Sequence, residues 1–470
     1  MVLDYIEASD LAGSESTPDH AARRADNDDY RLATNDCDTL AFAVMLPSRL
    51  LLVRQNFPDR RLADVPAEAR RQLEDSSFAA RLRPGARVAI GVGSRGIANI
   101  STIVHSVVQY WQRHGMAPFV FPAMGSHGAA TAEGQADVLA RFGMTEQSMG
   151  CPIVSRSEVV SLGKTDDGIE VFMDAVAHGA DAVMIVPRVK WHTTFDGRIE
   201  SGLMKMMAIG LGKFAGAQKY HTHAKRLGLE HVIRTVGRRV LQSGKVLGGL
   251  AIVEDAQHNT AKLDAVPADC MEQRDEENLA LAKSWMPRLP CDVDVLVVDE
   301  MGKNISGTGM DAKVVNRGPS GEYNPWPGLP SIQRIFVRDL DPQSHGNALG
   351  IGMADVTTDR LVRHIDWEPT RVNALSSGIP SRIRVPAHFP SDRECLQWIA
   401  ATAGKLDPAE VTFGWIRNTL ELDRVAISHN LRLEIGSQPR VEIEAEIELD
   451  WDRQGNLVSP FSVRAGAGHV

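Results

Sequence analysis

Apolar residues along the chain alternate between short continuous runs and longer stretches with helical spacing. Residues 87–92 form one such run, and apolar residues then recur every three or four positions up to Gly115. This pattern predicts a strand followed by a helix. The same succession returns with a strand at 118–121 and a helix at about 131–142, and another apolar run follows at 182–186. Apolar strands that alternate with amphipathic helices predict a parallel sheet covered on both faces.

A second series of elements begins after residue 270. An acidic helix is expected at about 274–283, and the apolar strand 294–298 then opens a second α/β region. Near the end, residues 441–449 alternate apolar and acidic positions, which predicts a half-exposed strand with its acids facing water. The first thirty residues hold few apolar positions, which is typical of a poorly ordered arm. We therefore expect an α/β protein with mostly parallel sheets and an active-site cleft between two domains: an arm at 1–30, a cofactor-binding domain at 31–290 and a second domain at 291–470.

Composition narrows the class of protein. The 470 residues are 43% hydrophobic and 24% charged, which is typical of a soluble globular protein. The net charge of −9 argues against nonspecific binding to nucleic acid. No window approaches the roughly 18 uninterrupted apolar residues that a membrane span needs. The five cysteines form no CxxC pair, and their odd number, with no signal-like apolar segment at the N-terminus, leads us to expect a cytoplasmic protein.

One segment of the chain has a positive net charge. Between Pro187 and Arg226, eight basic side chains stand against the two acids Asp196 and Glu200, so eight minus two gives a local charge of +6. Such a window would attract a small anion, or it is a solvated basic helix face, and charge alone leaves both interpretations open. The basic residues are Arg188, Lys190, Arg198, Lys205, Lys213, Lys219, Lys225 and Arg226.

Reactive side chains follow the predicted strands. In parallel α/β sheets, ligands bind beyond the carboxyl ends of the strands, where Arg95, His127 and His192 would emerge. Small neighbours would let the His127 imidazole reach a ligand, although a turn histidine bonded to local backbone is the alternative. His192 follows an apolar strand within the basic window, and its alternative is a capping or packing role beside Trp191.

Lys205 and two further histidines come next. Lys205 lies among apolar residues, a setting that would lower the pKa of its amine, although a surface lysine with a buried stem would show the same pattern. His221 and His223 are two positions apart, so they would share a face on an extended segment but not on a helix. We expect one of them to be a ligand and the other a bystander.

A glycine-rich turn offers a different interpretation. Residues 91–96 match GxGxxG between a predicted strand and a predicted helix, as in dinucleotide-binding turns. The acid that should hold the ribose, about 20 residues later at the end of the second strand, is missing. A nicotinamide-dependent dehydrogenase that uses Gly91, Gly93 and Gly96 stays an alternative, beside a phosphate cradle of backbone amides and Arg95.

Taken together, the order of five side chains resembles that of the nickel-pincer lactate racemase family, the nickel-dependent 2-hydroxyacid racemases and epimerases. The likeness is concentrated between about residues 87 and 223. One histidine stands in a His-x-x-Phe segment, and sixteen positions separate the lysine from the last histidine, as in that family. The five are Arg95, His127, His192, Lys205 and His221.

The resemblance implies a racemase or epimerase that moves a hydride between a small anionic 2-hydroxy acid and a nickel-pincer nucleotide. His127 and His192 would be the acid/base pair. Lys205 would carry the cofactor through a covalent thioamide link, and His221 would ligate nickel. A binding protein that kept the fold without the cofactor is a third interpretation, besides the dehydrogenase.

Further residues would hold the substrate and the cofactor. Arg95 would contact the substrate carboxylate or a cofactor phosphate, with Gly93 and Ser94 beside it at the cofactor. Lys303 and Asp311, in the glycine-rich stretch 302–311, would contact the substrate.

The chain departs from the family pattern in two places. Val92 and Ser94 stand where the family has an acidic residue and a threonine before its arginine. The family's Tyr-Gln-x-x-Lys run after a Gly-x-Pro turn is replaced here by a segment that contains Arg382 and Arg384. These arginines would supply a replacement carboxylate clamp, or they are surface residues. A 2-hydroxy acid other than lactate, such as a sugar acid, is therefore expected.

Overall fold

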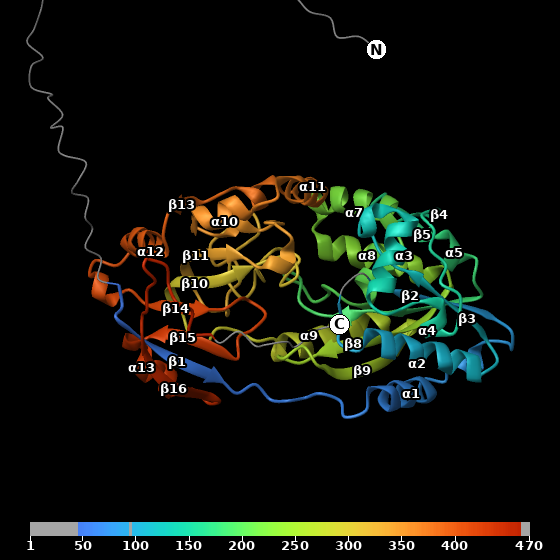
Figure 1. The fold of residues 1–470 in the computed structure, drawn as a ribbon. Coiled ribbons are helices and arrows are strands. Elements are labelled where there is room, and N and C mark those ends of the chain that lie inside the picture. Colours follow the sequence, from blue (N-terminus) through green and yellow to red (C-terminus); the bar gives the residue numbers. More distant parts are fainter. Residues whose placement is uncertain (1–45, 94–95, 462–470) are drawn as a thin grey trace, which may run out of the picture. The chain divides into compact units, whose positions relative to one another are not determined.

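The computed structural model describes residues 46–93 and 96–461, so the arm expected at residues 1–30 lies outside the described residues. Most of the described strands belong to two mixed sheets, and a two-stranded sheet is formed by β4 (Val159–Lys164) and β5 (Glu170–Asp174). Helices flank the strands throughout (Figure 1). The α/β fold class with mostly parallel sheets is thus confirmed.

The first large sheet has six strands in the order β3-β2-β6-β8-β7, with β9 beside β8. β2 pairs in parallel with β3 and with β6, and the pairing of β8 with β9 is antiparallel. The three strands predicted from apolar runs are confirmed as β2, β3 and β6. The bounds are β2 (Arg87–Val92), β3 (Ala117–Pro122), β6 (Ala182–Val186), β7 (Arg188–Val189), β8 (Val246–Glu254) and β9 (Thr260–Pro267).

The second large sheet has eight strands in the order β13-β12-β11-β10-β14-β15-β1-β16. Its first five strands are parallel to one another, whereas β15, β1 and β16 join by antiparallel pairing. The bounds are β1 (Arg49–Gln55), β10 (Val293–Met301), β11 (Ile332–Leu340), β12 (Val356–Thr358), β13 (Ala387–Phe389), β14 (Phe413–Ile416), β15 (Arg424–Ser428) and β16 (Val441–Glu448).

Strand β1 departs from the order of the chain. It comes from residues assigned above to the cofactor-binding domain, yet it lies in blue among the red strands β15 and β16 near the other end of the sequence (Figure 1). The division at residues 290 and 291 into two domains stays a prediction. The tail strand predicted at 441–449 is confirmed as β16. Glu444, expected to face water, forms ion pairs with Arg54 and Arg424.

Both faces of the six-stranded sheet are covered, which explains why its strands read as continuous apolar runs. In β2, Val88 and Ile90 pack in one apolar cluster with α1 and α2, whereas Ala89 packs in another with α8 and α9. The helices predicted around residues 100–115, 131–142 and 274–283 are confirmed as α2, α3 and α9. The bounds are α1 (Val65–Asp75), α2 (Ile100–Arg113), α3 (Ala132–Arg141), α4 (Glu146–Met149), α5 (Ala175–His178), α8 (Leu229–Gln242) and α9 (Met271–Trp285).

Apolar packing around the eight-stranded sheet uses α10, α12 and α13 together with the loops that follow β10. The remaining helix, α11, carries exposed Val372 and Leu375. The bounds are α10 (Asp359–His364), α11 (Trp367–Ser377), α12 (Asp392–Ala401) and α13 (Arg432–Gly436).

An unusual helical segment leads out of the six-stranded sheet. It consists of α6 (Leu203–Lys205), the π-helix Met206–Gly210 and α7 (Lys213–Leu227). The N-terminus of α6 is held by buried Asp275 of α9, which accepts hydrogen bonds from the backbone N–H groups of Leu203 (2.9 Å) and Met204 (3.0 Å). Burial raises the pKa of Asp275 to about 6. Because π-helices are rare and frequent at functional sites, this segment is a natural place to look for a site.

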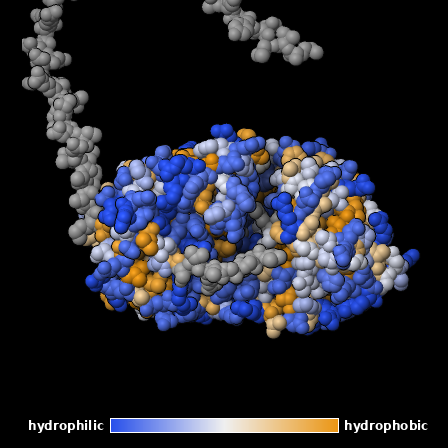
Figure 2. All heavy atoms as spheres, in the orientation of Figure 1, coloured by the Kyte–Doolittle hydropathy of each residue, from blue (hydrophilic) through white to orange (hydrophobic). Residues whose placement is uncertain are grey.

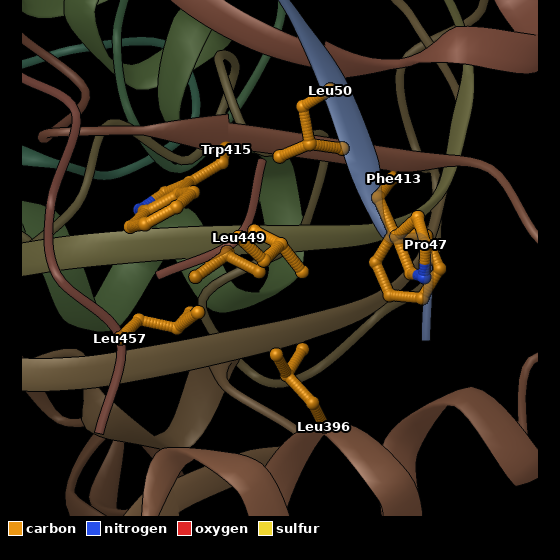
Figure 3. Close-up of a pocket in the computed structure, with 8 residues that line it drawn as sticks. Pro47, Leu50, Leu396, Phe413, Trp415, Leu449 and Leu457 are labelled. Carbon is orange, nitrogen blue, oxygen red and sulfur yellow. The ribbon is translucent and has the colours of Figure 1, made fainter. Parts of the chain in front are cut away.

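Hydrophilic residues dominate the face drawn in Figure 2, with smaller apolar groups between them. None of the described helices is both long and apolar enough to cross a membrane. A small pocket beside β1 and β14 is lined by apolar residues, among them Leu50, Phe413 and Trp415 (Figure 3). Since no acid or base lines this pocket among the described residues, it is not a candidate for catalysis.

Candidate active site

The predicted site residues follow the carboxyl ends of parallel strands, as the sheet geometry requires. β3 ends at Pro122 and leads to His127, which is exposed, while β6 and β7 lead to half-buried His192. β2 ends just before Gly93, and the adjoining Ser94 and Arg95 lie outside the described residues. The predicted cofactor and substrate roles of Ser94 and Arg95 therefore stay predictions.

The loop that carries His127 packs directly against α7. A Cβ built on Gly125 would lie 3.2 Å from Ala217 Cβ, and Ala217 precedes His221 by one turn of this helix. The structure therefore brings the His127 loop next to the helix that presents His221. Because α7 is helical at both positions, His221 and His223 point to different sides, as expected for a spacing of two.

Gly93 packs against the segment that carries Lys205. A Cβ built on Gly93 would lie 3.1 Å from Met206 Cε, and Met206 opens the π-helix immediately after Lys205. Lys205 is half-buried at the end of α6, where its Nζ donates to Ser201 Oγ at 3.4 Å. The glycine-rich turn and the predicted attachment lysine are thus neighbours.

His192 is fixed by its own segment. Its backbone N–H donates to the carboxylate of Glu200. The ring Nδ1 accepts from the backbone N–H of Thr194 at 3.2 Å and lies 2.9 Å from Thr194 Oγ1, and the ring packs against Phe195 with 4.7 Å between centroids. Because a nitrogen that accepts carries no proton, this contact favours the tautomer with its proton on Nε2.

Positive charge surrounds His192 and His221. Burial lowers the pKa of His192 well below 6.5, and the charges of Lys205, Lys313, His221 and Arg382 lower it further. His221 is exposed on α7, yet partial burial lowers its pKa as well, followed by the charges of Lys205 and Arg382. The two imidazoles and these basic side chains therefore share one electrostatic environment, in which His192 is neutral at neutral pH.

Beneath His192 lies a second group of charges, in which every cation is paired. Lys313 is 2% exposed, and its Nζ lies 2.9 Å from Asp196 Oδ1 and 3.3 Å from Glu200 Oε2. Lys283 contacts the same two carboxylates at 2.8 Å and 2.5 Å. Burial opposes ionisation of Asp196, yet the two lysines outweigh it and lower the pKa of Asp196 to about 2. These four residues, hereafter the paired cluster, hold the backbone of the His192 segment.

The two residues predicted from the glycine-rich stretch 302–311 have contacts of their own. Asp311 is 4% exposed and accepts from Trp191 Nε1 at 3.1 Å, and Lys190 Nζ lies 3.5 Å from the same oxygen. Lys303 donates to Asn373 of α11. Asp311 thus joins the stretch to the residue next to His192, and substrate contact by either side chain stays a prediction.

Two residues that hold the His127 loop were not predicted to have this role. Buried Lys213 donates to Pro122 O at 3.0 Å and to Gln135 Oε1 at 2.6 Å. Gln135 in turn donates to the backbone carbonyls of Gly125 (3.1 Å) and His127 (3.3 Å). Lys213 has a φ of +54°, a strained value for a residue with a side chain. The side chains of Lys213 and Gln135 hold the His127 loop. In the sequence, only the apolar setting of Lys213, which matches that of Lys205, could have indicated this role.

Folding neutralises much of the charge of the basic window, and its two interpretations stay open. Five of its eight basic residues pair with a carboxylate that lies outside the window, so most of the local charge is neutralised on folding. The positive charge at His192 comes from Lys205, which belongs to the window, and from Lys313 and Arg382, which lie far along the chain. The five pairs are Arg188–Glu254, Lys190–Asp311, Arg198–Glu276, Lys213–Asp174 and Lys219–Glu170.

In the described part of the chain, no group of three or more His, Cys, Asp and Glu side chains is placed to hold a metal ion.

No protein-family model and no curated protein sequence matches the chain. Among solved structures, it is similar to a protein from Thermotoga maritima at 10% identity, over 76% of this chain and 97% of that one, with a TM-score of 0.47. It is also similar to the lactate racemase apoprotein from Thermoanaerobacterium thermosaccharolyticum at 12% identity, over 73% and 87% of the two chains, with a TM-score of 0.43. Both scores are below 0.5, so we draw no conclusion about function from either likeness.

Proposed function

We propose that this protein interconverts the stereoisomers of a small 2-hydroxy acid with the help of a nickel-pincer nucleotide carried by Lys205. The observation that supports this is the grouping of His192, His221 and Lys205 in one electrostatic environment, beside which the His127 loop packs. The order of these residues in the sequence resembles that of a family with this chemistry. The proposal therefore joins a sequence pattern to a spatial one.

The residue types suit such a group. A nucleotide is anionic, and the positive charges of Lys205 and Arg382 act on this place. A low pKa keeps the His221 imidazole neutral, which is the form that ligates a metal. Lys205 offers the amine to which the cofactor would be joined, with Gly93 packed beside its segment. When bound, such a group supplies a site that accepts a hydride and returns it.

In this proposal His192 exchanges a proton with the substrate oxygen through Nε2. The Thr194 N–H supports the tautomer in which Nε2 carries the proton and donates. In the other tautomer Nδ1 carries the proton and donates a hydrogen bond to the Thr194 hydroxyl oxygen, 2.9 Å away, and Nε2 is then free to act as a base. Thr194 thus has a partner role for either tautomer of His192.

His127 completes the pair in this proposal by exchanging a proton from the other side of the substrate. Its loop is held by Lys213 and Gln135, so the position of the imidazole is set by buried contacts and not by exposed ones. Arg95, Lys303 and Asp311 are the proposed substrate contacts, and Ser94 is proposed to lie at the cofactor.

Intact mass spectrometry of the full chain, expressed beside cofactor-making enzymes, tests the attachment. We expect an added mass of nucleotide size and retained nickel, both lost in Lys205→Ala. Lys219→Ala is the matched control, because Lys219 is an exposed lysine of α7 paired with Glu170. The loaded protein should then reduce the optical purity of at least one acid in a panel of chiral 2-hydroxy acids.

Three results would contradict the proposal. One is the absence of both adduct and nickel under these conditions, and another is an adduct that persists in Lys205→Ala. The third is saturable binding of NADH in the micromolar range, measured by fluorescence, which would favour the dehydrogenase that uses Gly91, Gly93 and Gly96.

A further inference from the structure

Arg382 is a buried cation with no counter-charge among the described residues. It lies in the 3₁₀ helix Pro380–Ile383 and is 7% exposed, whereas Arg384, two positions later, is exposed. Arg382 Nε is buried and has no hydrogen-bond partner among the described residues. Burial is the one influence on the pKa of this guanidinium, which it lowers, and no carboxylate of the described chain raises it. Since a guanidinium does not lose its proton in proteins, the charge stays.

The other buried basic side chains show how unusual this is. Five lysine and arginine residues are buried in the described part of the chain, and four of them have a carboxylate partner. A buried charge is unfavourable unless it is paired, which is why such partners are the rule. The four pairs are Lys213–Asp174, Lys313–Glu200, Arg317–Asp355 and Arg338–Asp299.

The backbone around Arg382 is held closely by glycines. Gly350 donates its backbone N–H to Arg382 O at 2.9 Å. A Cβ on Gly352 would lie 2.0 Å from Ser381 O, and one on Gly350 would lie 1.7 Å from Thr308 O, so side chains are excluded at both positions. The glycine-rich stretches noted in the sequence thus pack backbone against backbone beside Arg382, which fixes the backbone from which its side chain extends.

The same contacts tie Arg382 to the candidate active site. Thr308 belongs to the stretch that continues to Asp311, and Asp311 accepts from the indole of Trp191, the residue before His192. In agreement with this path, the charge of Arg382 acts on His192. Arg382 is therefore a buried cation beside the proposed site, with no carboxylate partner in the part of the chain that the structure describes, and not a surface residue.

We propose that Arg382 binds the carboxylate of the substrate, so that the ligand supplies the negative charge that none of the described residues supplies. A guanidinium matches a carboxylate through two parallel N–H···O bonds. One guanidinium balances one carboxylate, whereas a phosphate dianion would leave an excess charge in a buried place. The identification of the ligand as a 2-hydroxy acid rests on the proposed function, while the presence of a carboxylate site rests on Arg382.

Isothermal titration of the full chain, without added cofactor, tests this site. The probes are sodium L-lactate, as the smallest chiral 2-hydroxy carboxylate, its uncharged amide lactamide, and inorganic phosphate. We expect lactate to bind the wild-type chain and Arg384→Met equally, and Arg382→Met about tenfold more weakly or worse. Arg382→Lys should recover only part of the affinity because it keeps the charge and loses the fork. Lactamide should bind at least about tenfold more weakly than lactate.

Each other outcome overturns the proposal. Equal lactate affinity in the wild-type chain and Arg382→Met, or no lactate binding by the wild-type chain, removes the carboxylate site. Phosphate that binds more tightly than lactate and is lost in Arg382→Met makes this a phosphate site instead. Circular dichroism of each variant verifies that it is folded.

The two proposals fail separately. If lactate binding depends on Arg382 but no nickel or Lys205 adduct forms, the proposed cofactor chemistry is wrong and the anion site stands. If the adduct forms while Arg382→Met binds lactate like the wild-type chain, the anion site is wrong and the proposed function stands.

Discussion

Two groups of charged side chains lie beside His192, and they differ in one respect. In the paired cluster, Lys313 and Lys283 face two carboxylates, so the charges balance within the protein. Around the His192 ring, Lys205 and Arg382 contribute positive charge, and Arg382 has no carboxylate partner in the described chain. Burial alone therefore does not separate a structural cation from a binding cation. The two kinds of cation are separated by whether the protein itself supplies the counter-charge.

His192 is in contact with both groups. Its backbone N–H donates to Glu200 of the paired cluster, and the charges of Lys205, Lys313 and Arg382 act on its ring. Removal of the ring should thus leave the paired cluster intact. The largest expected effect follows from this division.

We expect His192→Ala and His127→Ala each to lower turnover of the loaded enzyme by about a hundredfold or more, because each removes one acid/base group. Thermal unfolding should stay cooperative in both variants, since the ring of His192 and the exposed ring of His127 are separate from the paired cluster. Loss of optical purity of the accepted 2-hydroxy acid measures turnover.

His223→Ala is the control for these histidine variants. It lies on α7 two positions from His221, on a different side of the helix, and should keep wild-type turnover. A double variant of His127 and His192 that keeps its activity would contradict the acid/base assignment. The charges around the His192 ring would then have no shown link to catalysis.

The second expected effect is on stability, and it has opposite signs in the two groups. Lys313→Met should destabilise the fold by about 3 kcal/mol, because it leaves buried Glu200 with Lys283 as its remaining lysine. Arg382→Met should cause no loss of stability, or a gain, because it removes a buried charge that has no partner. Urea unfolding at pH 7 measures both. If the two substitutions are equally destabilising, Arg382 has a structural partner and the contrast is wrong.

Much of the fold could be predicted because its signals are local. Strands β2, β3, β6 and β10 are buried on both faces, so each is visible in the sequence as a continuous apolar run. The place of β1 could not be predicted in this way, because a strand's partner depends on contacts far along the chain. The same limit applied to the basic window, whose charges are neutralised by acids that lie outside it.

The candidate site shows the same division between local and distant signals. His127, His192, Lys205 and His221 could be chosen from loops, charge and a family resemblance, all of which are visible in the sequence. For Arg382 the sequence left open a carboxylate clamp or a surface residue, and its burial in the structure rules out the surface residue. Gln135, which holds the His127 loop, carried no signal because a glutamine in an amphipathic helix is ordinary.

The smallest expected effect is on titration, and it separates the two cations most sharply. Arg382 lowers the pKa of both His192 and His221, whereas Lys313 acts on His192 and is not among the influences on His221. We therefore expect Arg382→Met to raise both histidine pKa values toward 6.5, and Lys313→Met to raise that of His192 while His221 stays unchanged. NMR titration of the two imidazoles in the chain without cofactor measures this.

The same shifts determine how stability depends on pH. Because the folded-state pKa of His192 is lowered, the unfolded chain binds more protons below about 6.5, and stability falls as the pH drops through that window. Arg382→Met brings the folded-state pKa closer to the unfolded value, so urea midpoints should fall less steeply between neutral and acidic pH than in the wild-type chain. An unchanged slope, together with an unchanged His221 titration, would place Arg382 away from both imidazoles and break the contrast between the paired cluster and the unpaired arginine.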